Sequence, residues 1–126
     1  MLKARQAIAT VAVKDLASAR RFYSETLELK PTARQEEGTL SYQIGSSQLF
    51  VYPSRFAGTN EATAVTWIVD DTADVAKALA AKGVRFEHYD GLPSTRRDGD
   101  LHLAGNLKLA WFKDPDGNIH SLVSTH

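Results

Sequence analysis

The sequence predicts an α+β fold built from two modules, each with the order strand, helix and three strands. A shift of 56 residues superposes Val13 and Asp15 on Val69 and Asp71, so a strand that leads into a helix occurs twice. An Asp-Pro-Asp-Gly turn near the C-terminus lies between two alternating apolar runs, which is typical of two antiparallel strands. The repeat and the turn together predict βαβββ twice.

Both expected helices begin after an aspartate. Asp15 and Asp71 can each accept hydrogen bonds from the unpaired amides of a first helical turn. Apolar residues then follow at helical spacing on one face of each helix. These residues are Leu16, Ala19, Tyr23 and Leu27 in the first helix, and Val75, Ala78 and Leu79 in the second, which ends at Lys82 and Gly83.

The remaining strands are placed by alternation and by turn residues. The expected strands cover residues 40–44, 48–52, 84–88, 107–112 and 119–123, and a further strand starts near residues 28–30. We expect a single domain, 1–126, with module one at about 6–53, module two at about 62–124, and a connector between them.

Composition favours a small-molecule partner over a polymer or a membrane. The chain has 126 residues, 43% apolar and 24% charged, and its 15 basic residues balance its 15 acidic ones. It has no cysteine, so thiolate chemistry and disulfides are excluded. No apolar run approaches the roughly 20 residues that span a bilayer. We therefore expect no nucleic acid, no membrane association and a cytoplasmic location.

Two segments at opposite ends of the chain resemble a known family. The first is Val13-Lys14-Asp15-Leu16 followed by Ala19, Arg20, Phe22, Tyr23 and Leu27, and the second is Trp111 to Asn118. Together they are similar to the vicinal oxygen chelate superfamily of glyoxalases, bleomycin-resistance proteins and extradiol dioxygenases. The resemblance implies that the sheet of the two modules curls around a cavity. Glu28 departs from the family pattern, which has glycine there, so we expect a local difference after the first helix.

The resemblance also implies four positions at which relatives bind a divalent metal. Carried over residue by residue, these positions are Ile8, Phe50, Ala64 and Ser121. Divalent metals need carboxylate oxygen or imidazole nitrogen, and none of the four is a good ligand. We therefore expect no metal and no cofactor.

Strand alternation places a second set of residues on the same face as those positions. The expected ligand-binding residues are Ile8, Thr10, Phe50, Tyr52, Ala64, Thr66 and Ser121. They would form an apolar and aromatic surface with scattered hydroxyls. Trp67 has the opposite parity and is expected beneath a helix. Each threonine has an alternative role as an ordinary strand residue.

The histidines do not form a familiar ligand pattern. His88, His102, His120 and His126 have no recognised metal-ligand spacing. His120 has the parity that points toward the helices, so we expect a structural histidine. No serine has a nucleophile-elbow context, and no glycine-rich phosphate loop is present. We therefore assign no catalytic residue.

The segment 89–105 is long enough to suggest a lid. Structureless loops of more than about 12 to 15 residues tend to be functional or mobile, and this one carries Arg96, Arg97 and His102, which could meet an anionic group. The alternative is a solvated surface loop.

The sequence favours a small-molecule-binding protein of the glyoxalase and bleomycin-resistance type, which holds an organic ligand without chemistry. One alternative is a metal-dependent glyoxalase-like lyase or dioxygenase, with ligands at other positions. A second alternative is a structural or regulatory interaction module. Superfamily members commonly form homodimers, so we expect a homodimer here.

Overall fold

A computed structural model describes all 126 residues and divides the chain into two compact units. The first unit comprises residues 1–60 and 115–118, and the second comprises residues 61–114 and 119–126. The four residues 115–118, which form the turn singled out in the sequence, thus group with the first unit although they connect two strands of the second.

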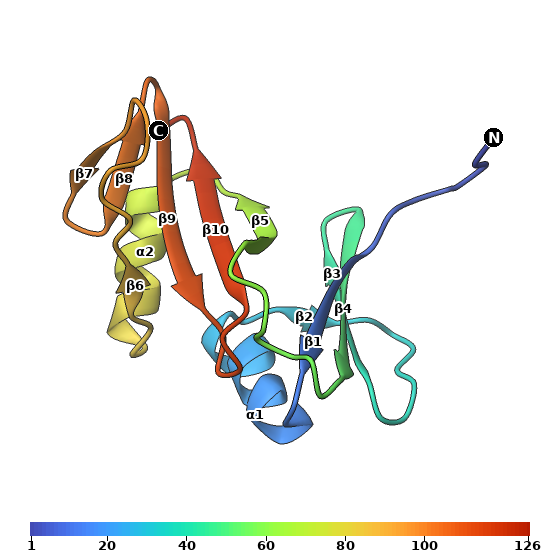
Figure 1. Cartoon of the computed structure of the whole chain (residues 1–126). Helices are drawn as coiled ribbons and strands as arrows, with labels where there is room; N and C mark the ends of the chain where they lie inside the picture. Colours follow the sequence, from blue (N-terminus) through green and yellow to red (C-terminus); the bar gives the residue numbers. More distant parts are fainter. The chain divides into compact units, whose positions relative to one another are not determined.

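The first unit has the expected order of strand, helix and three strands (Figure 1). Its strands are β1 (Ala9–Val13), β2 (Lys30–Pro31), β3 (Leu40–Ile44) and β4 (Ser47–Pro53). They form a four-stranded sheet in the order β1-β4-β3-β2, in which β1 and β4 are parallel and the other pairs are antiparallel.

The helix of the first unit changes type along its length. It begins as α1 (Leu16–Arg20) and continues as a π-helix, η1 (Arg21–Thr26). Asp15 caps it as predicted, because its side chain accepts from the amide of Ala17 at 3.0 Å. The hydrogen bond from Ser18 is the main reason why the pKa of Asp15 lies below its usual value.

Glu28 follows this helix with φ of 56°, in the left-handed region that favours glycine. We expected the backbone to differ here because glutamate replaces glycine. The backbone conformation nevertheless stays in the left-handed region. The chain keeps a left-handed residue after the helix, and glutamate occupies it.

The core of the first unit lies between the helix and one face of the sheet. Tyr23 from η1 is fully buried, and its ring lies 6.1 Å from that of Tyr42 in β3. Alternate residues of β1 and β4 complete this core, and they are Val11, Val13, Leu49 and Val51. The intervening residues of the same strands point to the other face of the sheet.

The second unit contains two more strands than the sequence predicted. Its elements are β5 (Thr63–Ile68), α2 (Thr72–Ala81), β6 (Phe86–Glu87), β7 (Arg96–Asp98), β8 (Leu101–Ala104), β9 (Leu107–Lys113) and β10 (Ile119–Ser124). The sheet order is β5-β10-β9-β8-β7, and β6 also pairs with β9. The mixed α+β class is confirmed, with the strands in two hydrogen-bonded sheets.

The expectation that residues 89–105 lack regular structure is wrong. β7 and β8 form an antiparallel hairpin within this segment, and Gly99 lies in its turn with φ of 61°. All three residues of β7 are charged and exposed, so the strand has no apolar alternation by which to recognise it.

Helix α2 buries a different set of residues from the set expected. Thr72, Ala76 and Leu79 are buried, whereas Ala78 is exposed. Thr72 is buried because its polar atoms are satisfied: its hydroxyl donates to the Lys108 carbonyl at 2.9 Å, and its amide donates to Ser124 Oγ at 2.9 Å. The helix is thus fixed at its first turn, where Asp71 also accepts from the Asp74 amide as the predicted cap.

His120 lies in the core of the second unit, as predicted from its parity. Its ring is stacked between Phe112, at 5.0 Å, and Trp67, at 6.0 Å, and its Nδ1 accepts from Trp67 Nε1 at 2.9 Å. Burial lowers the pKa of His120 to about 4, so the ring is neutral near pH 7. The prediction that both residues face the helix side is confirmed, and Trp67 is half-buried there rather than fully enclosed.

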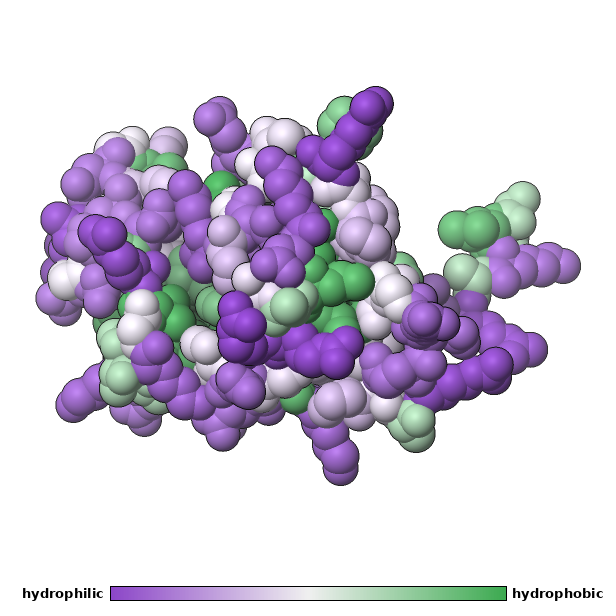
Figure 2. Space-filling view, turned by 90° about the horizontal axis from the view of Figure 1, so that it is seen from below, coloured by the Kyte–Doolittle hydropathy of each residue, from purple (hydrophilic) through white to green (hydrophobic).

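Hydrophilic side chains dominate the surface, and hydrophobic residues show between them in separate patches on the face drawn in Figure 2. None of the helices is both long and apolar enough to span a bilayer.

Candidate functional site

The two faces of the second sheet differ in what covers them. Two neighbouring rows of side chains cross the same four strands β5, β10, β9 and β6, one row on each face. The helix-side row consists of Val65, His120, Phe112 and Phe86, and the open-side row consists of Thr66, Ser121, Trp111 and Glu87. The helix α2 packs against β9 and β10. The open-side row is the candidate site of this unit.

Three of the predicted ligand-binding residues lie on β5 and β10. Thr66 and Ser121 are register partners, and Ser121 Oγ donates to Thr66 Oγ1 at 2.9 Å. Ala64 precedes Thr66 by two residues on the same strand and is exposed. The structure therefore brings the two predicted hydroxyls of this unit together, with Thr66 exposed and Ser121 buried beside it.

Trp111 is the central member of the open-side row, and the sequence interpretation did not assign it to the site. It is half-buried, and its Nε1 donates to Thr63 Oγ1 at 3.2 Å. Its ring meets Tyr89 edge-on at 5.3 Å and His102 edge-on at 4.7 Å. The signal was available in the sequence, because Trp111 lies directly across the hairpin from the predicted residue Ser121.

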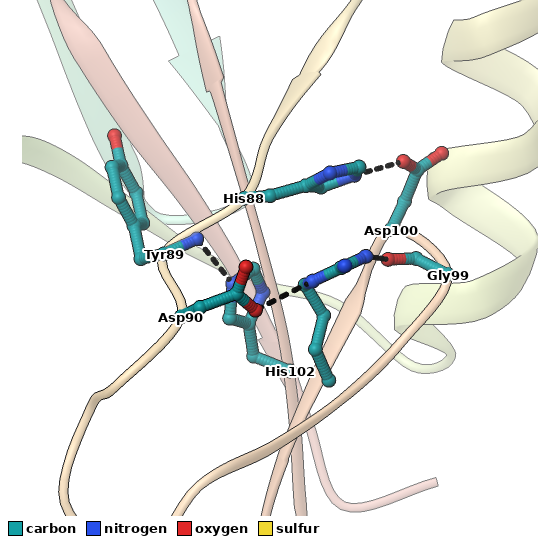
Figure 3. A network of polar contacts seen from close by, with 7 residues as sticks. His88, Tyr89, Asp90, Gly99, Asp100 and His102 are labelled. Carbon is teal, nitrogen blue, oxygen red and sulfur yellow. Dashed lines mark hydrogen bonds and ion pairs between the residues drawn. The ribbon is translucent and has the colours of Figure 1, made fainter.

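The predicted lid residue His102 lies in strand β8 and is fully buried. Its Nε2 accepts from the backbone amide of Tyr89 at 3.0 Å (Figure 3). Burial lowers the pKa of His102, and His88 and Arg97 lower it further, so the ring is neutral near pH 7. His102 thus supports the aromatic cluster with Tyr89 and Trp111, and the neutral ring offers no charge to an anion.

The other two predicted lid residues lie in β7. Arg97 is the register partner of His102, and its guanidinium donates to Asp90 Oδ1 and to the Gly99 carbonyl, both at 2.8 Å. The hydrogen bond from Arg97 keeps the pKa of Asp90 below its usual value. Arg96 is exposed and pairs with Leu103, next along β7 from Arg97.

A second contact ties the segment after β6 to the β7–β8 hairpin, since His88 Nε2 lies 2.8 Å from Asp100 Oδ1. Figure 3 shows this contact beside the contacts of Asp90 and Tyr89, all reaching from one strand connection to the hairpin. The segment that the sequence presented as a lid is therefore held by at least three polar contacts in this structure.

The first sheet has an open face of the same kind. Thr10 of β1 and Ser41 of β3 both flank Phe50 of β4, opposite the helix-side residues. The rings of Phe50 and Tyr52 are stacked with their centroids 6.2 Å apart and an interplanar angle of 11°. The predicted residues Thr10, Phe50 and Tyr52 are thus neighbours, whereas Ile8 lies just before β1, with its carbonyl accepting from the Thr10 hydroxyl at 3.2 Å.

The four positions at which the resemblance implies a metal do not fit one. Ile8, Phe50 and Ala64 have no side-chain atom that can coordinate an ion, and the hydroxyl of Ser121 is engaged with Thr66. No three histidine, aspartate or glutamate side chains gather elsewhere in a way that could hold an ion. His120 is enclosed by aromatic rings in the core. The donor set gives no basis for a metal-centred reaction step.

Comparison with known proteins gives one sequence match at the family level. The family model described as the Glyoxalase/Bleomycin resistance protein/Dioxygenase superfamily matches residues 5–121. No curated protein matches the sequence.

Solved structures share the fold at low sequence identity. A glyoxalase family protein from Enterococcus faecalis superposes with a TM-score of 0.71 at 18% identity, covering 98% of this chain and 100% of that one. The fosfomycin resistance protein FosX from Listeria monocytogenes gives 0.69 at 13% identity, covering 98% and 94%. A lactoylglutathione lyase from Agrobacterium tumefaciens gives 0.66 at 14% identity, covering 96% and 94%.

Proposed function

Because the chain belongs to the glyoxalase, bleomycin-resistance and dioxygenase superfamily, we propose that it binds a small organic molecule on an open face of its sheets, without a catalytic metal. Bound in this way, the ligand is held and kept from other targets, and no bond in it is broken. The single observation that carries the proposal is the open-side row, which combines a half-buried tryptophan with hydroxyl groups and contains no set of metal ligands.

The hydroxyls of this row have hydrogens to offer. Ser121 donates its hydrogen to Thr66 Oγ1, which leaves the Thr66 hydrogen available for an acceptor on the ligand. In the same way, Thr63 accepts from Trp111 Nε1 and keeps its own hydrogen. A ligand that bears carbonyl, ether or hydroxyl oxygens would satisfy both donors.

The aromatic groups define the rest of the ligand. Trp111 and Tyr89 meet edge-on at 5.3 Å, and this arrangement leaves polarisable ring surface beside the two hydroxyls. Phe50 and Tyr52 form a separate aromatic surface on the first sheet, which would suit a ligand of the same kind. We therefore propose a ligand with an aromatic or otherwise flat apolar body and several acceptor oxygens.

Thermal protection with defined probes tests the proposal. We expect aromatic oxygen-rich compounds, with bleomycin as one probe, to raise the melting temperature, whereas fosfomycin serves as a small probe without a ring. A ligand at about 100 times its Kd adds about 2.7 kcal/mol to the unfolding free energy. Trp111→Leu and Thr66→Val should reduce the protection, and Phe56→Leu, at an exposed aromatic residue outside the sheets, should not.

The two alternatives predict different outcomes. A metal-dependent lyase or dioxygenase requires stoichiometric metal together with turnover of the methylglyoxal–glutathione adduct or of catechol, and that result would overturn the binding proposal. An interaction module predicts protection by a protein partner and by none of the small molecules. We also propose a homodimer in the cytoplasm, which light scattering after gel filtration and cell fractionation would check.

A further inference from the structure

A cleft lies in the first unit, on the side of the sheet that the helix covers. It has a volume of about 480 Å³ and is lined by Arg20 and Ser24 of the helix, by Gln35, Glu36 and Glu37 of the loop before β3, and by Tyr42 of β3. Tyr42 belongs to the buried, helix-covered side of the sheet. The volume falls in the range of about 300 to 1,000 Å³ that is typical of small-molecule sites.

The inner end of this cleft offers a hydrogen-bond donor. Ser24 Oγ and the Tyr42 hydroxyl lie 2.8 Å apart, and one donates to the other. Each hydroxyl carries one hydrogen, so the contact uses one of two hydrogens and leaves the other for a ligand. Tyr42 is almost completely buried and Ser24 is half-buried, so the pair is partly removed from bulk water.

The backbone that presents Ser24 is unusual. Ser24 lies within the π-helix Arg21–Thr26, and the Leu27 amide donates to the Phe22 carbonyl at 2.9 Å, five residues earlier. π-Helical turns are rare and occur frequently at functional sites, because they change which residue a helix presents at a given place. The π-helix therefore marks Ser24 as a candidate site residue independently of the cleft.

Charged side chains of both signs line the cleft. Arg20 lies four residues before Ser24, and its guanidinium makes no ion pair in the structure. Across the cleft, Glu36 forms only an exposed ion pair with Arg34 at 3.3 Å, and Glu37 forms none. A cationic donor and two carboxylates therefore line the same small volume.

The loop that carries these carboxylates is fixed to the sheet. The Gln35 side chain donates to the Ser41 carbonyl at 2.8 Å and accepts from the Ser41 amide at 3.1 Å. It also donates to the Thr32 carbonyl at 3.0 Å. The wall of the cleft is thus formed before any ligand binds, and this lowers the entropic cost of binding.

We infer that this cleft binds a small zwitterion of the amino-acid class with an apolar side chain. The ligand carboxylate would accept from Arg20 and from the spare hydroxyl of the Ser24–Tyr42 pair. Its ammonium group would lie against Glu36 and Glu37, and its side chain would lie against Leu40 and Pro31, which also line the cleft. This site is separate from the proposed ligand site on the open faces and stands without it.

Nuclear magnetic resonance titration of the full chain with three probes tests the inference. L-Leucine carries both charges, N-acetyl-L-leucine lacks the ammonium, and L-leucinamide lacks the carboxylate. We expect L-leucine to shift backbone amide signals of residues 20–24 and 35–42, and to bind severalfold more tightly than either analogue. Equal binding of N-acetyl-L-leucine would show a simple anion site and would overturn the inference, as would shifts confined to other residues or no shifts at all.

Neighbouring arginines provide a matched pair of variants. Arg20→Gln should weaken L-leucine binding about tenfold, because it removes a charge-assisted hydrogen bond. Arg21→Gln is the control, since Arg21 does not line the cleft and its guanidinium lies 3.4 Å from Ser18 Oγ. Ser24→Ala should also weaken binding, with thermal unfolding recorded to show that the variants fold. Equal affinities of Arg20→Gln and Arg21→Gln would contradict the proposed role of Arg20.

Discussion

The helix-side row and the open-side row cross the same four strands of the second sheet, and their side chains meet opposite conditions. In the helix-side row, Val65, His120 and Phe112 are buried, and the one polar ring is satisfied by Trp67. In the open-side row, Thr66 is exposed and Trp111 is half-buried, whereas Ser121 is buried and donates to Thr66, which keeps its own hydrogen. Adjacent residues of one strand therefore contribute either to the buried core or to the exposed face of the sheet.

The difference indicates where stability and binding reside. A buried row whose polar groups are satisfied contributes to the free energy of unfolding, and changes in it leave cavities or unpaired polar groups. A row with exposed donors and partly exposed rings contributes less to folding and leaves its interactions for a ligand.

Phe112 and Trp111 are consecutive residues that point to opposite faces of β9. Phe112→Ala should lower the free energy of unfolding by about 3 to 5 kcal/mol, because it opens a cavity beside His120. Trp111→Ala should cost about 1 to 2 kcal/mol, since the ring is already partly in water. Urea denaturation of both variants measures these losses. Equal losses would show that the open-side row is also core.

The buried His120, in the helix-side row, should make the free energy of unfolding depend on pH. Burial lowers its pKa in the folded chain from 6.5 to about 4, so the unfolded chain binds the proton more readily between these values. The stabilisation is present above about pH 6.5 and is lost as the pH falls to about 4. The shift corresponds to a loss of about 3 kcal/mol, at about 1.36 kcal/mol for each pKa unit.

His120→Phe provides the comparison for this prediction, because it keeps an aromatic ring between Phe112 and Trp67 and removes the titrating group. The variant lacks the acceptor of Trp67 Nε1 at every pH. This loss lowers its free energy of unfolding by the same amount throughout and adds no pH dependence. The wild-type chain should lose more stability than the variant between pH 7 and pH 4.5. His102 adds a dependence of the same sign in both proteins. Parallel curves would contradict the assignment to His120.

The smallest expected difference in the free energy of unfolding is between valine substitutions of two threonines, Thr72 and Thr66. Thr72→Val on the helix side should cost about 1 to 2 kcal/mol, because it removes the buried hydroxyl that donates to the Lys108 carbonyl and contacts Ser124 Oγ. Thr66→Val on the open face should cost less, about 0.5 to 1 kcal/mol, because Thr66 is exposed and only the Ser121 hydroxyl loses its acceptor. Thermal and urea unfolding compare the two, and a cost for Thr66→Val as large as that for Thr72→Val would give Thr66 a folding role.

The sequence predicted those parts of the fold that depend on local chemistry. Asp15 and Asp71 cap their helices because a side-chain oxygen and the first helical amides are close in sequence. Strand alternation alone predicted to which face of the sheet His120 and Trp67 point. The fold class followed from the repeat and from the closing turn.

Other features depend on contacts that no local pattern encodes. The π-helix after Arg20 and the left-handed Glu28 have no distinctive sequence signal. Strand β7 is charged and exposed throughout, although Asp98-Gly99 is a recognised hairpin signal that could have located its turn. Trp111 could be located from its place across the closing turn from Ser121, but its contacts with Tyr89 and His102 join segments that are distant in sequence.

The central claim is that the open faces bind a ligand without a metal, and metal content tests it most directly. The purified chain would be incubated with zinc, nickel, manganese and ferrous ions, passed through gel filtration and analysed by mass spectrometry for bound metal. The account predicts far less than one ion per chain, with Ser121→Ala indistinguishable from wild type. About one tightly bound ion per chain, lost in Ser121→Ala, would contradict it.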